Sequence, residues 1–300
     1  MRVGAPVPVR WLPVLLAGLV PGAARAESPD EPPPLPAVDG QCVVLLHGLG
    51  RTYRSMARIE SALHEAGYAT ANIGYPSQSQ AIEASARTAI PEGVRECREA
   101  GARTIHFVTH SMGGLLLRYY LSTEHIDGLG RAVMLGPPNQ GSEVADALVG
   151  TALYDRFNGP AGAQLVTGPD GIAARLGPVD FPLGVIAGNE ATAIDSVLAT
   201  RIPGESDGKV AVARARVEGM SDFLVLPVNH TFMMVNDVVI GQTLQFLRYG
   251  AFLHEAGSGR HPMKKPRLAA GFFCRTRSGR DQSSGVMFEA WAPFGPWVTS

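Results

Sequence analysis

The chain alternates between short apolar runs and segments in which apolar residues recur at helical spacing. The apolar runs predict β-strands at 42–46, 69–73, 104–108, 131–135, 183–187 and 223–226. Helical spacing predicts helices at 56–66, 81–100, 112–121, 142–149 and 237–247, the second of them interrupted or capped near Pro91. Because strands and helices alternate in this order, we expect an α/β fold with a mostly parallel sheet covered by helices on both faces.

Three segments do not follow this alternation. Residues 27–40 are acidic and proline-rich, which is typical of a stiff linker. Residues 151–182 are rich in Gly, Pro and Ala and weakly periodic, so we interpret them as a short cap-like insert without a large amphipathic lid. Residues 254–300 are basic and lack a sustained apolar period, which favours a poorly ordered tail. The expected folded domain therefore spans residues 41–253.

The first residues have the pattern of a secretory signal peptide. Arg2 and Arg10 supply positive charge, residues 11–20 form an apolar run, and the letters ARA at 24–26 are a small-x-small cleavage site. The apolar run has about half of the ~20 residues that span a bilayer, which argues against a membrane anchor. We therefore expect a signal peptide at 1–26 and export to the periplasm or the outside.

Composition and charge add limits on the binding partners. The 300 residues are 45% hydrophobic, which is enough for one well-buried core. The formal net charge of −1 gives no overall field that would attract nucleic acid or an anionic membrane. No stretch after the N-terminal run is long and apolar enough to cross a membrane.

The chain contains three cysteines, Cys42, Cys97 and Cys274, so at least one is unpaired. In an oxidising compartment Cys42 and Cys97 could form a disulfide, because both should lie near the N-terminal part of the sheet. We favour the alternative that both are buried thiols. No cysteine has a metal-type spacing.

A candidate nucleophile lies where the third predicted strand meets the following helix. The letters THSMGG at 109–114 place Ser111 in this strand-to-helix turn, with Gly113 two residues later. Thr109 stands where glycine is usual in such a turn. Ser111 could be an ordinary helix N-cap, but that alternative does not explain the preceding strand or the paired glycines.

A second loop can supply donors for a developing oxyanion. The first predicted strand runs into the letters HGLG at 47–50, and the glycines allow this loop to approach closely. Acyl transfer needs two backbone N–H groups where negative charge appears. We expect the N–H groups of Leu49 and Met112 to form this oxyanion hole.

Together, THSMGG and VVLLHGLG resemble motifs of the lipase and esterase branch of the α/β-hydrolase superfamily, as in bacterial secreted lipases. The resemblance covers about residues 41–252 and implies a triad in the order serine, acid, histidine. His230 is the histidine that fits, because it lies between the last predicted strand and the last predicted helix. The acid is Asp207 or Glu190. We prefer Asp207 because the letters DGKV at 207–210 resemble the family's acid turn, and Asp195 and Glu205 are weaker candidates.

The resemblance implies ester hydrolysis through an acyl-enzyme on Ser111, with an ester or lipid-like small molecule as substrate and no metal or organic cofactor. Acyl transfer and thioester cleavage use the same groups and stay open, as does a non-catalytic binding protein of this fold. Four apolar residues lie near the expected pocket and suit an acyl chain: Leu49, Met112, Leu115 and Met134.

Overall fold

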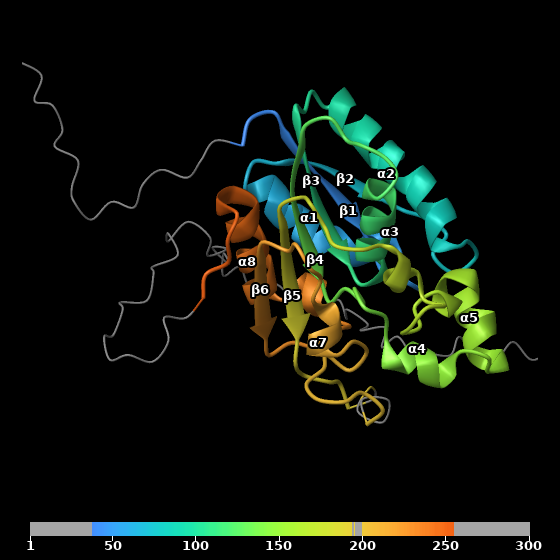
Figure 1. Cartoon of the computed structure of the whole chain (residues 1–300). Coiled ribbons are helices and arrows are strands. Elements are labelled where there is room, and N and C mark those ends of the chain that lie inside the picture. Colours follow the sequence, from blue (N-terminus) through green and yellow to red (C-terminus); the bar gives the residue numbers. More distant parts are fainter. Residues whose placement is uncertain (1–37, 194, 196–199, 255–300) are drawn as a thin grey trace, which may run out of the picture. The chain divides into compact units, whose positions relative to one another are not determined.

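The computed structural model describes residues 38–193, 195 and 200–254 and contains a six-stranded parallel sheet (Figure 1). The strands are β1 (Gln41–Leu46), β2 (Ala69–Ile73), β3 (Thr104–His110), β4 (Leu129–Leu135), β5 (Leu183–Gly188) and β6 (Asp222–Leu226). The α-helices are α1 (Ala57–Glu65), α2 (Ile82–Glu99), α3 (Met112–Leu121), α4 (Glu143–Leu148), α5 (Ala152–Ala163), α7 (Val212–Ala215) and α8 (Asp237–Tyr249). Short 3₁₀ turns lie at η1 (Tyr53–Met56), η2 (Ile172–Arg175) and η3 (Met233–Val235).

The order of the strands determines where a ligand can bind. The strands lie in the order β2-β1-β3-β4-β5-β6, and every neighbouring pair is parallel. The chain therefore moves from β1 to β2 on one side and then returns to β3 on the other side of β1. Sheets of this type bind ligands outside the carboxyl ends of the strands at such a reversal.

Two apolar layers enclose the sheet, because successive strand residues point to opposite faces. In β1, Val43 and Leu45 belong to one layer, and Val44 and Leu46 belong to the other. The first layer includes buried residues of α1 and α8 (Ile59, Leu63, Val239, Phe246). The second includes buried residues of α2 and α3 (Ile82, Ile90, Leu115, Leu116). Strands buried on both faces explain the continuous apolar runs in the sequence.

The α/β architecture predicted from the sequence is confirmed, and every predicted strand lies within an observed one. The predicted interruption near Pro91 is wrong, because α2 is one helix over Ile82–Glu99. Pro91 is exposed, so water can satisfy the carbonyl that loses its N–H partner. The opposite face of α2 packs so closely on β1 that a Cβ at Gly93 would lie 2.5 Å from Val44 Cγ1. This packing keeps the helix continuous through the proline.

The expectation of two buried thiols is also wrong. Cys42 in β1 and Cys97 in the last turn of α2 form a disulfide, with their Cα atoms 5.6 Å apart. Both residues are fully buried, and α2 lies across β1, so the two side chains meet. A cross-link over 55 residues stabilises a fold by about 4 kcal/mol in the chain-entropy model.

Several predictions fall on residues outside the described ranges. These are the signal peptide, nearly all of the linker, Cys274 and the tail after His254. Within residues 38–193, 195 and 200–254, no helix combines the length and the apolarity that a bilayer crossing requires.

Candidate active site

Ser111 lies in a sharp turn between β3 and α3. Its backbone has φ 54° and ψ −125°, and no other described non-glycine residue has a positive φ. Such strain in a serine between a strand and a helix is typical of a nucleophile elbow. The turn leaves no room for larger neighbours, since a Cβ at Gly113 would lie 2.7 Å from the Leu46 carbonyl oxygen. The fold therefore holds the Ser111 hydroxyl at the carboxyl end of the central strand.

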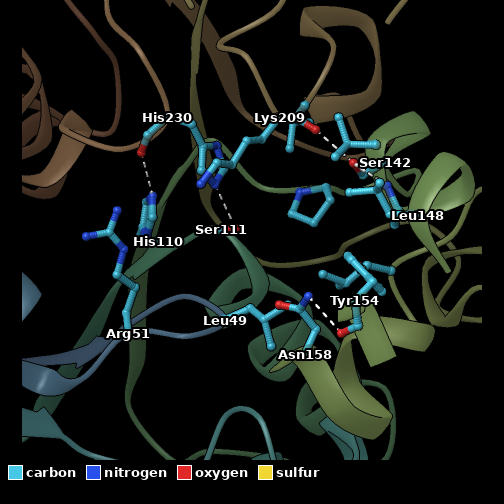
Figure 2. A pocket seen from close by; sticks show the side chains of 15 residues that line it. Leu49, Arg51, His110, Ser111, Ser142, Leu148, Tyr154, Asn158, Lys209 and His230 are labelled. Atoms are coloured by element: carbon cyan, nitrogen blue, oxygen red, sulfur yellow. Dashed lines mark hydrogen bonds between the residues drawn. The ribbon is translucent and has the colours of Figure 1, made fainter. Parts of the chain in front are cut away.

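His230 joins the serine to a carboxylate. Its Nε2 lies 3.0 Å from Ser111 Oγ, and its Nδ1 lies 2.7 Å from Asp207 Oδ2. His230 and Asp207 are only 4% and 1% exposed, so both contacts are shielded from water. Nδ1 donates to the carboxylate, which leaves Nε2 free to accept the serine proton. Figure 2 shows His230 directed at Ser111.

The loops after β5 and β6 fix these two side chains. The second carboxylate oxygen of Asp207, Oδ1, accepts hydrogen bonds from the N–H groups of Lys209 at 3.0 Å and Val210 at 2.8 Å. The His230 N–H donates to the Asp207 carbonyl at 3.0 Å, which joins the two loops. Asp207 and His230, which are 23 positions apart in the sequence, therefore form one hydrogen-bonded unit.

The structure places the other acidic candidates elsewhere. Glu190 and Glu205 are exposed, and Glu190 contributes a backbone hydrogen bond to Val228. Asp195 is buried but accepts the hydroxyl of Thr192 at 2.7 Å. Among the described residues, Asp207 is the carboxylate that reaches His230.

The two expected oxyanion donors follow two neighbouring strands, β1 and β3. Leu49 follows β1 and lines the cavity that contains Ser111, while Met112 is the first residue of α3. Among the described residues, neither backbone N–H has a hydrogen-bond acceptor. Within the part of the chain that the structure describes, both donors are therefore unengaged.

His47 and Tyr75 brace the loop that carries Leu49, and sequence reasoning gave them no role. Their rings stack with centroids 4.1 Å apart, and the Tyr75 hydroxyl donates to the His47 carbonyl. His47 Nδ1 donates to the Gly48 carbonyl at 2.9 Å, and its Nε2 accepts the Tyr75 N–H at 3.3 Å. Burial lowers the pKa of His47, which agrees with this neutral tautomer. Tyr75 lies 26 residues after Leu49, so no local sequence pattern indicates that it contacts the loop of Leu49.

His110, the residue before Ser111, supports the loop that carries His230. Its Nε2 donates to the His230 carbonyl at 3.0 Å, while its buried Nδ1 has no partner among the described residues. Burial holds the pKa of His110 well below its usual range, and the charges of His230 and Arg51 lower it further. His110 therefore stays neutral and fixes the backbone of His230.

The cavity at Ser111 has a volume of about 230 Å³ and an apolar side made by residues after β4. This side includes residues in and near α4 and α5, namely Val144, Ala145, Leu148, Tyr154 and Leu165. Of the four apolar residues expected there, Leu49 lines the cavity. Met112, Leu115 and Met134 are fully buried in the core instead, because α3 and β4 turn these side chains into the apolar layer between helix and sheet.

The cap-like insert contains a helix that its sequence did not predict. α5 covers Ala152–Ala163 with a kink at Gly159, and Pro160 and five alanines or glycines dilute its apolar pattern. Gln164 ties the end of α5 to α2, accepting the Ile82 N–H at 2.8 Å and donating to Glu83 at 2.6 Å. The cap is therefore a short helical wall anchored to the sheet domain.

No family model and no curated protein matches the sequence. Solved structures are similar in fold. The mature form of lipase BlEst2 from Bacillus licheniformis has a TM-score of 0.57 and 19% identity over 69% of this chain and 91% of that chain. The metagenomic carboxyl esterase MGS0156 has a TM-score of 0.52 and 21% identity over 69% of this chain and 70% of that chain. At these identities the likeness concerns the fold.

Proposed function

We propose that this chain, which has the α/β-hydrolase fold, is a serine hydrolase that cleaves carboxylic esters. The observation that carries the proposal is the continuous contact from Ser111 Oγ through His230 to Asp207, at 3.0 and 2.7 Å. The strained turn at Ser111 adds support, because strain of this kind is kept at functional sites. The similarity of fold to a lipase and a carboxyl esterase agrees with this chemistry.

In the first half of the reaction, Ser111 Oγ attacks the ester carbonyl while His230 Nε2 takes the hydroxyl proton. The Asp207 carboxylate holds the imidazole in the tautomer that can accept this proton and stabilises the imidazolium that forms. The free N–H groups of Leu49 and Met112 donate to the oxyanion of the tetrahedral intermediate. His230 then protonates the leaving alcohol, and the acyl group remains on Ser111.

In the second half, His230 removes a proton from water, which attacks the acyl-enzyme through a second oxyanion. Collapse of this intermediate releases the acid and returns the proton to Ser111. His230 needs a fixed position in both halves, and the hydrogen bond from His110 to its carbonyl supplies one restraint. None of these steps changes the oxidation state of any group.

The substrate class follows from the walls of the cavity. An apolar acyl chain fits beside Leu148, Val144 and Leu165, where water would be displaced from apolar surface. The volume of about 230 Å³ suits a short or medium chain better than a long one. Hydrolysis of an ester or lipid-like molecule with such a chain is the activity that we propose.

The test is a panel of p-nitrophenyl esters from acetate to dodecanoate, measured with the wild type, Ser111→Ala and Ser122→Ala. Ser122 is an exposed serine at the other end of α3, so its variant is a matched control. Ser111→Ala should lose at least about 10³-fold in kcat/KM with an unchanged circular dichroism spectrum. Hydrolysis of a short ester by Ser111→Ala at the wild-type rate would contradict the proposal.

We also propose that the chain is exported after cleavage near Ala26. The N-terminal pattern and the Cys42–Cys97 disulfide support this, because disulfides persist in oxidising compartments. Cell fractionation with mass spectrometry of the purified N-terminus tests it. An uncleaved chain confined to the cytosol would contradict it.

A further inference from the structure

Two cations lie beside Ser111 in the cavity. Arg51 follows the HGLG loop and Lys209 follows Asp207, and both line the cavity wall. In Figure 2 Arg51 lies on the same side as His110 and His230, opposite the residues of α4 and α5. The cavity therefore has a cationic side and an apolar side.

Among the described residues, these two cationic side chains are largely without partners. Arg51 donates one hydrogen bond, from Nη2 to the Thr231 carbonyl at 3.3 Å. Within the described residues, the Lys209 ammonium has neither a hydrogen-bond acceptor nor an ion-pair partner within 4.0 Å. Burial lowers the pKa of Lys209 in spite of the opposing charge of Asp195. A partly buried ammonium without a partner is unfavourable, and an anionic ligand would relieve that cost.

The nearby carboxylates are already engaged. Both oxygens of Asp207 accept hydrogen bonds, one from His230 and the other from the N–H groups of residues 209 and 210. Asp195 attracts both Arg51 and Lys209, but its Oδ2 accepts the Thr192 hydroxyl and it forms no ion pair with either cation among the described residues. Asp207 also attracts Lys209, but neither carboxylate forms an ion pair with Lys209 or Arg51 among the described residues, so both cationic groups can take a further anionic partner.

The position of the cations indicates which part of a substrate they meet. In serine hydrolysis the base protonates the leaving group, so the leaving group lies beside the base. Arg51 bonds the residue after His230, and Lys209 lies two residues after Asp207. The acyl chain then lies against the opposite, apolar side of the cavity. We propose, on the basis of the function proposed above, that Arg51 and Lys209 form a subsite for an anionic leaving group, so that preferred esters join an apolar acyl chain to an alcohol bearing a phosphate or carboxylate.

Matched ester pairs test this subsite. The first pair is 3-carboxy-4-nitrophenyl butanoate and 4-nitrophenyl butanoate, which differ by one carboxylate on the leaving group. The second is 1-butanoylglycerol 3-phosphate and 1-butanoylglycerol, which tests phosphate. The readout is the ratio of kcat/KM for the anionic ester to that for its neutral partner. Loss of folded enzyme cancels in this ratio.

The wild type should favour the anionic member of at least one pair, and the pair with the larger ratio identifies phosphate or carboxylate as the recognised group. Lys209→Gln and Arg51→Gln should each lower that ratio about tenfold, as expected for loss of a desolvated ion pair. Lys209→Arg should retain most of it. Arg95→Gln, which removes an exposed cation on α2, should leave the ratio unchanged.

Two results would overturn the subsite. One is an unchanged ratio in both Lys209→Gln and Arg51→Gln. The other is a preference for mono-4-nitrophenyl succinate, whose anion is in the acyl part, over both leaving-group anions. If the wild type cleaves no ester, the proposed esterase function fails, and calorimetry with glycerol 3-phosphate and glycerol decides on the subsite. Binding of the phosphate that Lys209→Gln abolishes would support the subsite, and absence of binding to the wild type would contradict it.

Discussion

The cavity has two walls that are built in different ways. The sheet wall consists of the loops at the carboxyl ends of the strands, residues 47–50, 110–114, 207–210 and 228–231, and buried hydrogen bonds fix its groups. The cap wall consists of residues 142–165 and supplies apolar surface, with Leu153 and Phe157 exposed to solvent. The sheet wall holds the groups that we propose react, and the cap wall contacts what we propose is the acyl chain. Substitutions in the sheet wall should therefore alter the rate of hydrolysis, and substitutions in the cap wall should alter the choice of substrate.

The largest expected effect is in the sheet wall. Asp207→Asn should keep the fold but lower kcat by about 10⁴-fold, as the same change does in a serine protease, because the amide favours the wrong tautomer of His230. Glu190→Gln is the matched control, since Glu190 is exposed and follows β5. Steady-state kinetics on both variants measure the effect. A near-normal kcat in Asp207→Asn together with a large loss of kcat in Glu190→Gln would show that Glu190, and not Asp207, is the acid.

Substitutions in the cap wall should have smaller effects, and these effects should be on the selectivity between substrates. Leu148→Trp fills part of the cavity, so the ratio of kcat/KM for the octanoate ester to that for the acetate ester should fall about tenfold. Leu153→Trp, on the exposed side of the same wall, should leave this ratio unchanged. An equal loss on both esters in Leu148→Trp would show that the cap also positions the reacting groups.

Acid should destabilise the sheet before the cap. Burial lowers the pKa of His47 and His110, and it lowers that of His106 to about 4. Each histidine binds a proton in the unfolded chain at pH values where the folded chain does not, so stability falls as the pH drops below 6.5. His106 alone should cost about 2 kcal/mol between pH 6.5 and pH 5.

Urea unfolding at pH 7 and pH 5 measures this loss, and His106→Gln should reduce it. Residues 142–165 contain no histidine, so the protection of backbone N–H groups from hydrogen exchange, corrected for the intrinsic rate at each pH, should fall more in β3 than in α5 at pH 5. Equal unfolding free energies at the two pH values would show that these histidines do not stay neutral.

The smallest expected effect is the increase in hydrolysis rate when the substrate forms a lipid interface. The cap is held to α2 through Gln164 and to the acid loop through Ser142, whose hydroxyl donates to the Lys209 carbonyl at 2.7 Å. Opening it as a lid would break these bonds, so the hydrolysis rate of tributanoylglycerol should rise no more than about twofold at its solubility limit. A sharp increase there would show that the cap opens as a lid at the interface.

The sheet wall could be predicted from the sequence because its signals are local. A strand followed directly by Ser111 and a helix can be recognised within a dozen residues, and so can the loop carrying Leu49. Chain order then limited the histidine to His230, and the geometry brings it beside Ser111. The resemblance of the turn at 207–210 favoured Asp207 over Glu190, and the contact between His230 and Asp207 agrees with that preference, while Glu190 is exposed.

Only part of the cap wall could be predicted: helical spacing at 142–149 corresponds to α4, whereas the rest of the wall depends on packing. The pattern of α5 is diluted by Gly159 and Pro160, so the sequence did not predict a helix there. Packing also decides positions outside the cap wall. Met112 was expected near the cavity, but α3 directs its side chain into the core. The partners of Cys42 and Tyr75 lie 55 and 28 residues away, and no local pattern encodes such contacts.

Labelling with a fluorophosphonate tests the central claim most directly, because the probe reacts with a serine only where a base and oxyanion donors activate it. The labelled protein is digested and the modified peptide is mapped by mass spectrometry, with Ser111→Ala and Asp207→Asn run in parallel. The account predicts one modified residue, Ser111, with no label in Ser111→Ala and much slower labelling in Asp207→Asn. Label on a different serine, or none on a folded wild type, would contradict it.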